Sequence, residues 1–181
     1  MPTVKQRRRR PKKSFLLSKR RFVQLVLFLL MLALGLGGGF FLRGRVISVA
    51  DGDSLTVLTQ QGERQRIRLY GIDAPESRQA GGAAATAFAR SEALFAEVEL
   101  KIIDTDRYGR SVALVFLPDG RMLNEELVKH GHAWVYDSYC RLPVCAKWRI
   151  LENEAKINEK GLWTDKNPVP PWIWRRNNRP S

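Results

Sequence analysis

The chain has 181 residues, a length typical of one domain with extensions, and a formal net charge of +13. Residues 1–21 carry ten Lys/Arg and no acid, and residues 165–181 carry four basic residues against one acidic residue, whereas residues 43–164 carry seventeen of each sign. The body of the protein is therefore neutral, which excludes its overall charge as an argument for nucleic-acid binding.

An apolar run, "FVQLVLFLLMLALGLGGGFFL", occupies residues 22–42 and contains no charge. As a helix its 21 residues would span about 31 Å, enough to cross the hydrocarbon core of a bilayer. Ten cations precede it and only Arg43 and Arg45 closely follow it, so the positive-inside rule places the N-terminus in the cytoplasm and the body outside. We expect an uncleaved single-pass signal anchor; secretion after signal cleavage is the alternative.

Three strands are predicted after this run. Residues 45–50, 54–59 and 64–70 each alternate between apolar and polar side chains, and the short turns "DGD" and "QQGE" separate them. This pattern predicts a three-stranded meander.

Helices and strands alternate through the rest of the body. A helix is predicted over residues 83–95, and strands are predicted over residues 97–103 and 111–117. Asn124 is expected to cap a short helix that ends at residue 129, and a last helix is expected over residues 147–160. Strands with helices inserted between and after them indicate a small α+β domain, in which a closed or nearly closed five-stranded barrel leaves few free strand edges.

The C-terminal tail, "NPVPPWIWRRNNRPS", is predicted to be too proline-rich for a helix. Its residues Trp172 and Trp174 either staple it to the body or contact lipid. The expected organisation is a basic cytoplasmic head (1–21), a transmembrane signal anchor (22–42), the folded domain (43–164) and a Pro/Trp/Arg-rich tail (165–181).

Two cysteines, Cys140 and Cys145, flank "RLPV". Outside the cytoplasm a disulfide is expected for such a pair. A zinc site with His130 and His132 is the alternative, although the C-x4-C spacing is wider than usual for zinc ligands.

Four carboxylates lie where predicted strands end: Asp51 and Asp53 in one turn, and Asp73 and Glu76 in "RLYGIDAPE". If adjacent strands bring these ends together, their hard oxygen atoms suit Ca²⁺ or Mg²⁺.

Arginines accompany these acids. Arg68 precedes the second pair and Arg110 ends "DRYGR". A site with a metal, acids and guanidinium groups suits a phosphate ester, because cations neutralise the phosphoryl oxygens while a carboxylate takes a proton from water. Taken singly, each segment also fits an ordinary turn.

Five separated motifs, taken together, resemble the staphylococcal nuclease (thermonuclease) family. They are "VADGDSL" (49–55), "RLYGIDAPE" (68–76), "DRYGR" (106–110), "LNEELVKHGHAWV" (123–135) and "GLW" (161–163). The resemblance covers residues 43–164 and implies an OB-type five-stranded barrel with three helices. It also implies calcium-dependent phosphodiester hydrolysis of DNA and RNA.

The resemblance assigns the metal ligands by motif. Asp53 and Asp73 would be the side-chain Ca²⁺ ligands, and Ala74 would give a backbone carbonyl at a position where the family often has threonine. Asp51 matches a further acid that reaches the metal through water.

The resemblance also assigns the reacting groups and the pocket. Glu76 matches the general base, and Arg68 and Arg110 match the arginines on the scissile phosphate. Tyr108 and Tyr139 match tyrosines that line the nucleotide pocket. One family tyrosine is replaced by Asp137, and the "CRLPVC" loop is an insertion beside it, which bears on substrate preference.

The expected function is therefore that of a membrane-anchored, outward-facing, Ca²⁺-dependent nuclease. One alternative is a non-catalytic binding module of the same fold, although relatives of that kind lose the acids and arginines that this chain keeps. Another is a nucleic-acid-binding protein that acts through its basic head.

Overall fold

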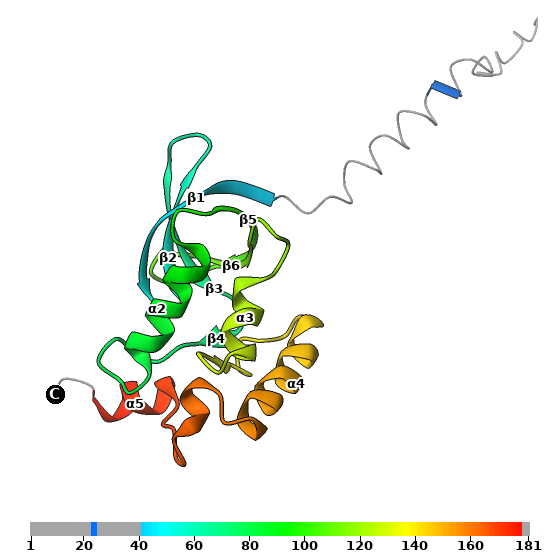
Figure 1. Cartoon of the computed structure of the whole chain (residues 1–181). Coiled ribbons are helices and arrows are strands. Elements are labelled where there is room, and N and C mark those ends of the chain that lie inside the picture. The colour runs from blue at the N-terminus through cyan, green and yellow to red at the C-terminus, as the bar shows by residue number, and fades with distance from the viewer. Residues whose placement is uncertain (1–22, 25–40, 179–181) are drawn as a thin grey trace, which may run out of the picture. The chain divides into compact units, whose positions relative to one another are not determined.

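The structure, a computed structural model, describes residues 23–24 and 41–178 (Figure 1). Among these residues, no helix is both long and apolar enough to cross a bilayer. The predicted span at residues 22–42 lies outside the described residues, except for two residues near each end. Phe41 and Leu42 open strand β1, where they pair with Lys101 and Leu100, so this strand begins two residues before the expected start of the domain at residue 43.

Five strands form a closed barrel in the order β1-β2-β3-β6-β5. They are β1 (Phe41–Asp51), β2 (Ser54–Thr59), β3 (Arg64–Leu69), β5 (Glu97–Thr105) and β6 (Ser111–Phe116). β3 pairs with β6 in parallel and the other neighbours pair antiparallel. The predicted five-stranded barrel is confirmed. Its alternating strands bury one face around side chains such as Val46, Val57 and Ile67, each with no exposed surface.

The helices and a small second sheet complete the α+β fold. The helices are α2 (Gly82–Ala93), α3 (Leu123–Lys129), α4 (Val144–Ile157), a 3-10 turn η1 (Gly161–Thr164) and α5 (Pro171–Asn177). The two-stranded sheet joins β4 (Ile72–Asp73) to β7 (Trp134–Val135). In Figure 1, α5 lies beside the loop that leads into α2.

The tail was predicted to be non-helical, and this prediction is wrong. Pro171 stands in the first turn of α5, where its missing N–H needs no partner and its fixed φ suits the helix. With α5 the described part of the chain has four α-helices rather than the three expected. The last predicted helix, residues 147–160, is also shifted, because α4 starts at Val144 directly after Pro143.

Asn124 was predicted to cap helix α3, but Met122 occupies the cap and Asn124 is buried inside the helix. Its side-chain oxygen accepts the Val115 N–H at 3.0 Å, and its amide donates to the carbonyls of Tyr70 and Ala113 at 3.0 and 3.2 Å. Asn124 therefore ties α3 to β6 and to the turn after β3.

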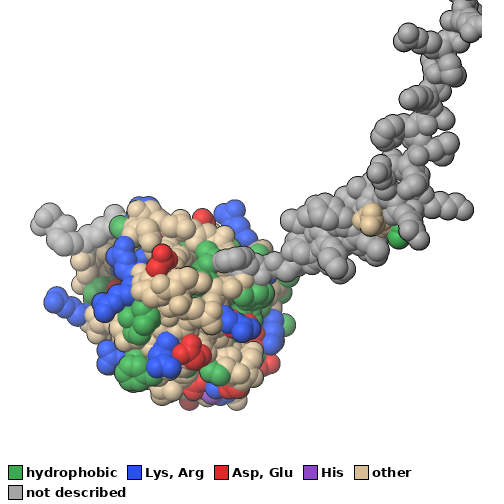
Figure 2. Space-filling model, turned by 90° about the horizontal axis from the view of Figure 1, so that it is seen from above, with side chains coloured by type: hydrophobic (Ala, Val, Ile, Leu, Met, Phe, Trp, Pro, Cys, Tyr) green, Lys and Arg blue, Asp and Glu red, His purple; other side chains and the backbone are tan. Residues whose placement is uncertain are grey.

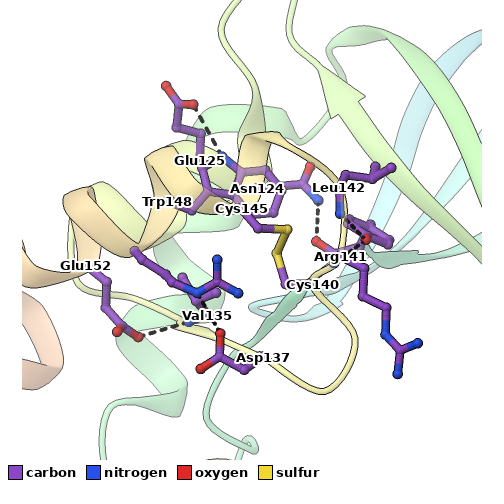
Figure 3. Close-up of a disulfide and its surroundings, with 12 residues drawn as sticks. Asn124, Glu125, Val135, Asp137, Cys140, Arg141, Leu142, Cys145, Trp148 and Glu152 are labelled. Atoms are coloured by element: carbon purple, nitrogen blue, oxygen red, sulfur yellow. Dashed lines mark hydrogen bonds and ion pairs between the residues drawn. A yellow bond between two sulfur atoms is a disulfide. The ribbon is translucent and has the colours of Figure 1, made fainter.

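The predicted Cys140–Cys145 disulfide is confirmed, with 5.7 Å between the two Cα atoms (Figure 3). The zinc alternative is wrong because both sulfurs are in this bond. His130 and His132 instead lie against the ring of Phe88, with ring centroids 5.1 and 4.5 Å apart.

The surface agrees with the neutral charge count of residues 43–164. On the face shown in Figure 2, Lys/Arg and Asp/Glu side chains are interspersed. Recognition of a charged ligand must therefore depend on particular side chains.

Candidate active site

The "DGD" turn lies against the end of β3 and the residue that follows β4. The Leu69 N–H donates to the Asp53 carbonyl at 2.8 Å, and the Ala74 N–H donates to Asp53 Oδ2 at 2.6 Å. Gly52 permits this approach, because a Cβ there would lie 2.7 Å from the Cβ of Ala74 and 2.8 Å from that of Ala85. The turn residues and the residues after β3 thus meet, as expected if adjacent strands bring the two acid pairs together.

Arg68 joins the two buried acids of this site. Its guanidinium pairs with Asp53, and its Nη2 lies 2.6 Å from Asp73 Oδ1. The two carboxylates are 2% and 0% exposed, and the arginine side chain is 19% exposed. Buried carboxylates need a paired cation, and the shared guanidinium supplies one.

Arg175, from α5, reaches Asp73 and Glu76, a role that the sequence did not reveal. Its Nη2 lies 2.7 Å from Asp73 Oδ2 and its Nη1 lies 2.8 Å from Glu76 Oε1. Hydrogen bonding to Asp73, and then to Glu76, raises the pKa of Arg175 although partial burial opposes this, so the guanidinium stays charged. The only sequence signal was a pair of arginines beside the tail tryptophans.

Arg110 approaches the site from the turn before β6. Its Nη1 donates to Ser54 Oγ at 3.3 Å, and that hydroxyl donates to Asp53 Oδ1 at 3.2 Å. Its Nε lies 2.7 Å from Asp106 Oδ2. Burial raises the pKa of Asp106, but hydrogen bonds from Arg110 and from the Tyr108 N–H outweigh this and hold it below its usual value.

Asp51 has a different role from the other acids, because its Oδ1 accepts the Asp53 N–H at 3.1 Å and shapes the turn. Among residues 23–24 and 41–178, no group of three or more His, Cys, Asp or Glu side chains stands close enough to hold a metal ion. The metal ligands that the resemblance assigns therefore stay a prediction. The buried carboxylates of Asp53 and Asp73 converge on one cation, the Arg68 guanidinium. The same two carboxylates fit a hard metal ion whose remaining ligands are a backbone carbonyl and water.

Tyr108 lies close to Arg110, and its side chain is well exposed, at 60%. Arg107 and Arg110 place their guanidinium carbons 4.9 and 5.8 Å from the Tyr108 ring centroid. The Tyr108 carbonyl accepts a hydrogen bond from Arg66 at 2.9 Å. The exposed ring is therefore held among cations.

Tyr139 is 64% exposed, and its ring centroid lies 4.8 Å from that of Tyr136. Tyr136 stacks on Trp172 of α5, with 5.0 Å between centroids and 3° between planes. Asp137, which replaces a family tyrosine, turns instead to Arg149 at 2.8 Å (Figure 3). Sequence reasoning missed Tyr136, which links the pocket wall to the tail.

The fold and the site together define a small α+β protein built on a closed five-stranded barrel, with buried acids and arginines at its strand ends. Comparison with known sequences identifies the family. The model of the family described as "Staphylococcal nuclease homologue" matches residues 66–165, and the chain belongs to the staphylococcal nuclease family.

Several curated relatives match over most of their length. The chain is 40% identical to an "Uncharacterized endonuclease" of Escherichia coli O157:H7 over 156 residues, which covers 86% of this chain and 97% of the relative. It is 37% identical to a "Micrococcal nuclease" of Shigella flexneri over 142 residues, 74% of this chain and 80% of the relative. It is 39% identical to "Protein ParB" of Escherichia coli over 148 residues, 76% of this chain and 82% of the relative.

Proposed function

We propose that this protein is a Ca²⁺-dependent nuclease that hydrolyses phosphodiester bonds of DNA or RNA. The observation that carries the proposal is the continuous set of contacts that gathers Asp53, Asp73 and Glu76 with their arginines at one end of the barrel. The names of the endonuclease and nuclease relatives support the same reaction.

The side chains divide the reaction between them. Arg68 and Arg110 hold the phosphoryl oxygens, because planar guanidinium groups bind two oxygens at once and neutralise charge that grows in the transition state. Glu76 takes a proton from the water that attacks phosphorus, after which the bond from phosphorus to the leaving oxygen breaks. Its side chain is 34% exposed and so accessible to water, whereas Asp73 is buried.

Asp53 and Asp73 would hold the Ca²⁺ ion, with the Ala74 carbonyl, and Asp51 would reach it through water. When bound, the ion would polarise a phosphoryl oxygen as a Lewis acid. Carboxylate oxygens are hard ligands of the kind that Ca²⁺ prefers.

The exposed rings of Tyr108 and Tyr139 would line the pocket for the nucleotide. Aromatic faces stack on bases with little regard to sequence, which suits a nuclease of broad specificity. The Asp137 side chain pairs with Arg149, so Tyr139 and Tyr136 would form the aromatic wall of this pocket.

We also propose that residues 22–42 anchor the protein in a membrane and that the nuclease domain faces away from the cytoplasm. The ten cations that precede the apolar run support this orientation. The Cys140–Cys145 disulfide supports an oxidising compartment. Secretion after signal cleavage remains the alternative localisation.

The test is a cleavage assay on the full-length protein in detergent, with plasmid DNA and with RNA, first in Ca²⁺ and then in excess chelator. We expect cleavage that stops with chelation and returns when Ca²⁺ is restored. Full activity in chelator would contradict the calcium assignment. Binding without cleavage under all conditions would favour a non-catalytic module. A truncation that begins at Phe41, where β1 starts, should keep cleavage; loss of nucleic-acid binding would instead favour the basic head.

A further inference from the structure

Helix α5 is fixed to the body by several independent contacts that surround the active site. The side-chain amide of Gln79 donates to the Val169 carbonyl at 2.5 Å, while the Gln79 N–H donates to the carbonyl of Glu76 at 2.8 Å. Trp172 stacks on Tyr136, and Pro171 is buried. The tail is thus attached to the same loop that carries the general base.

This attachment places Arg175 on the acids of the site. Its two terminal nitrogens contact both oxygens of Asp73, at 2.7 and 3.2 Å, and one of them also contacts Glu76 at 2.8 Å. Arg68 also contacts Oδ1, so guanidinium groups occupy three of the about four lone-pair sites of this carboxylate.

We infer that Arg175 is an internal cation that competes with the divalent metal for Asp73, and that α5 thereby sets the metal affinity of the enzyme. The inference rests on the proposed function, since it takes Asp73 as a metal ligand. A metal ion that binds Asp73 on the side held by Arg175 would need the same lone pairs as the guanidinium, so that contact must open before the metal can bind there. Two positive charges also repel strongly at short range in a partly buried site.

The size of the effect follows from the fraction of molecules in which Asp73 is free. If Arg175 occupies the carboxylate nine-tenths of the time, the apparent metal affinity is lowered about tenfold, because only the open fraction binds. Removing the guanidinium should therefore raise the apparent metal affinity by the same factor.

The chain provides a matched control. Arg176 is the next residue of the same helix, and no ion pair joins it to an acid in the part of the chain that the structure describes. Arg176→Gln therefore changes the net charge of α5 as much as Arg175→Gln does, without touching Asp73.

The experiment is calorimetric titration of Ca²⁺ into the full-length protein and its variants, with folding checked by circular dichroism. We expect Arg175→Gln to bind Ca²⁺ about 3- to 30-fold more tightly than the parent protein, and Arg176→Gln to bind as the parent does. Trp172→Ala, which removes the stack that holds α5, should shift affinity in the same direction as Arg175→Gln. In chelator Arg175→Gln should melt at a lower temperature than the parent, and Ca²⁺ should raise its Tm by more.

Four results would overturn the inference. Equal Ca²⁺ affinity in Arg175→Gln and the parent would show that the contact does not compete, and weaker affinity would show that Arg175 organises the metal site. An equal gain in Arg176→Gln would assign the effect to net charge. If neither the parent nor Arg175→Gln binds Ca²⁺, the calcium proposal falls together with this inference, whereas the first three results leave the proposed nuclease intact.

Discussion

Glu76 and Arg110 have different proposed roles in the same site, so replacing each of them should impair the reaction in a different way. Glu76→Gln keeps the shape but cannot take a proton, so we expect kcat to fall by about 10²- to 10⁴-fold. Arg110→Ala removes a charge aimed at the phosphoryl oxygens, so we expect a loss on the order of 10²- to 10³-fold in kcat together with a higher KM. Steady-state kinetics on a defined oligonucleotide measures both.

Matched controls exist for both replacements. Glu63→Gln changes an exposed acid in the turn before β3, and Arg64→Ala removes an exposed arginine at the start of β3. Both controls should keep near-parental kcat/KM. If folded Glu76→Gln and Arg110→Ala did so too, the binding module would become the better interpretation.

Asp106 makes the stability of the folded protein depend on pH in the acid range. Its pKa is lowered in the folded protein, so its contribution to stability is fully present above the pKa of the unfolded chain, about 3.9, and is lost as the pH falls through the folded value. The difference in free energy of unfolding between the parent and Asp106→Asn should therefore be constant above about pH 5 and shrink below about pH 4. Urea unfolding across this range measures it; a difference that grew with acid would contradict the assignment.

At the scale of elements, Asn124 connects α3 to the barrel through buried hydrogen bonds. Asn124→Ala leaves the Val115 N–H without its side-chain acceptor, and each buried group left unsatisfied costs about 1 to 3 kcal/mol of unfolding free energy. Chemical denaturation measures the loss. Asn158→Ala, at an exposed position after α4, is the matched control and should stay within about 0.5 kcal/mol of the parent.

A structural feature of this protein could be predicted from the sequence where its signal lies within a short stretch of the chain. Alternation in β2 and β3 is a local property, so the barrel and the convergence of Asp53, Arg68 and Asp73 could be predicted. The role of Asn124 could not be predicted. Asparagine is common both as a helix cap and as a buried side chain that bonds to backbone groups, and only tertiary packing decides which role it has. Arg175 lies 99 residues beyond Glu76 along the chain, and no motif joins them. The metal ligands remain a prediction.

At the scale of the whole molecule, the proposed topology exposes the nuclease domain outside the cytoplasm. Protease added to intact cells or spheroplasts should digest residues 43–181 and leave the cytoplasmic head, because ten cations hold the N-terminus inside. Immunoblotting with tags at each end measures the fragments. Digestion of the nuclease domain only after lysis would show that the protein has the opposite orientation.

The parallel pairing of β3 with β6 has a consequence for folding. These strands are separated in sequence by α2 and β5, and their register aligns Arg68 with Val112, two residues after Arg110. Such distant pairings carry a large loop-closure entropy and tend to form late. The two arginines should therefore meet only when the barrel closes, so a partly folded chain would have no phosphate site and would be unable to cut nucleic acid before it reached its native state.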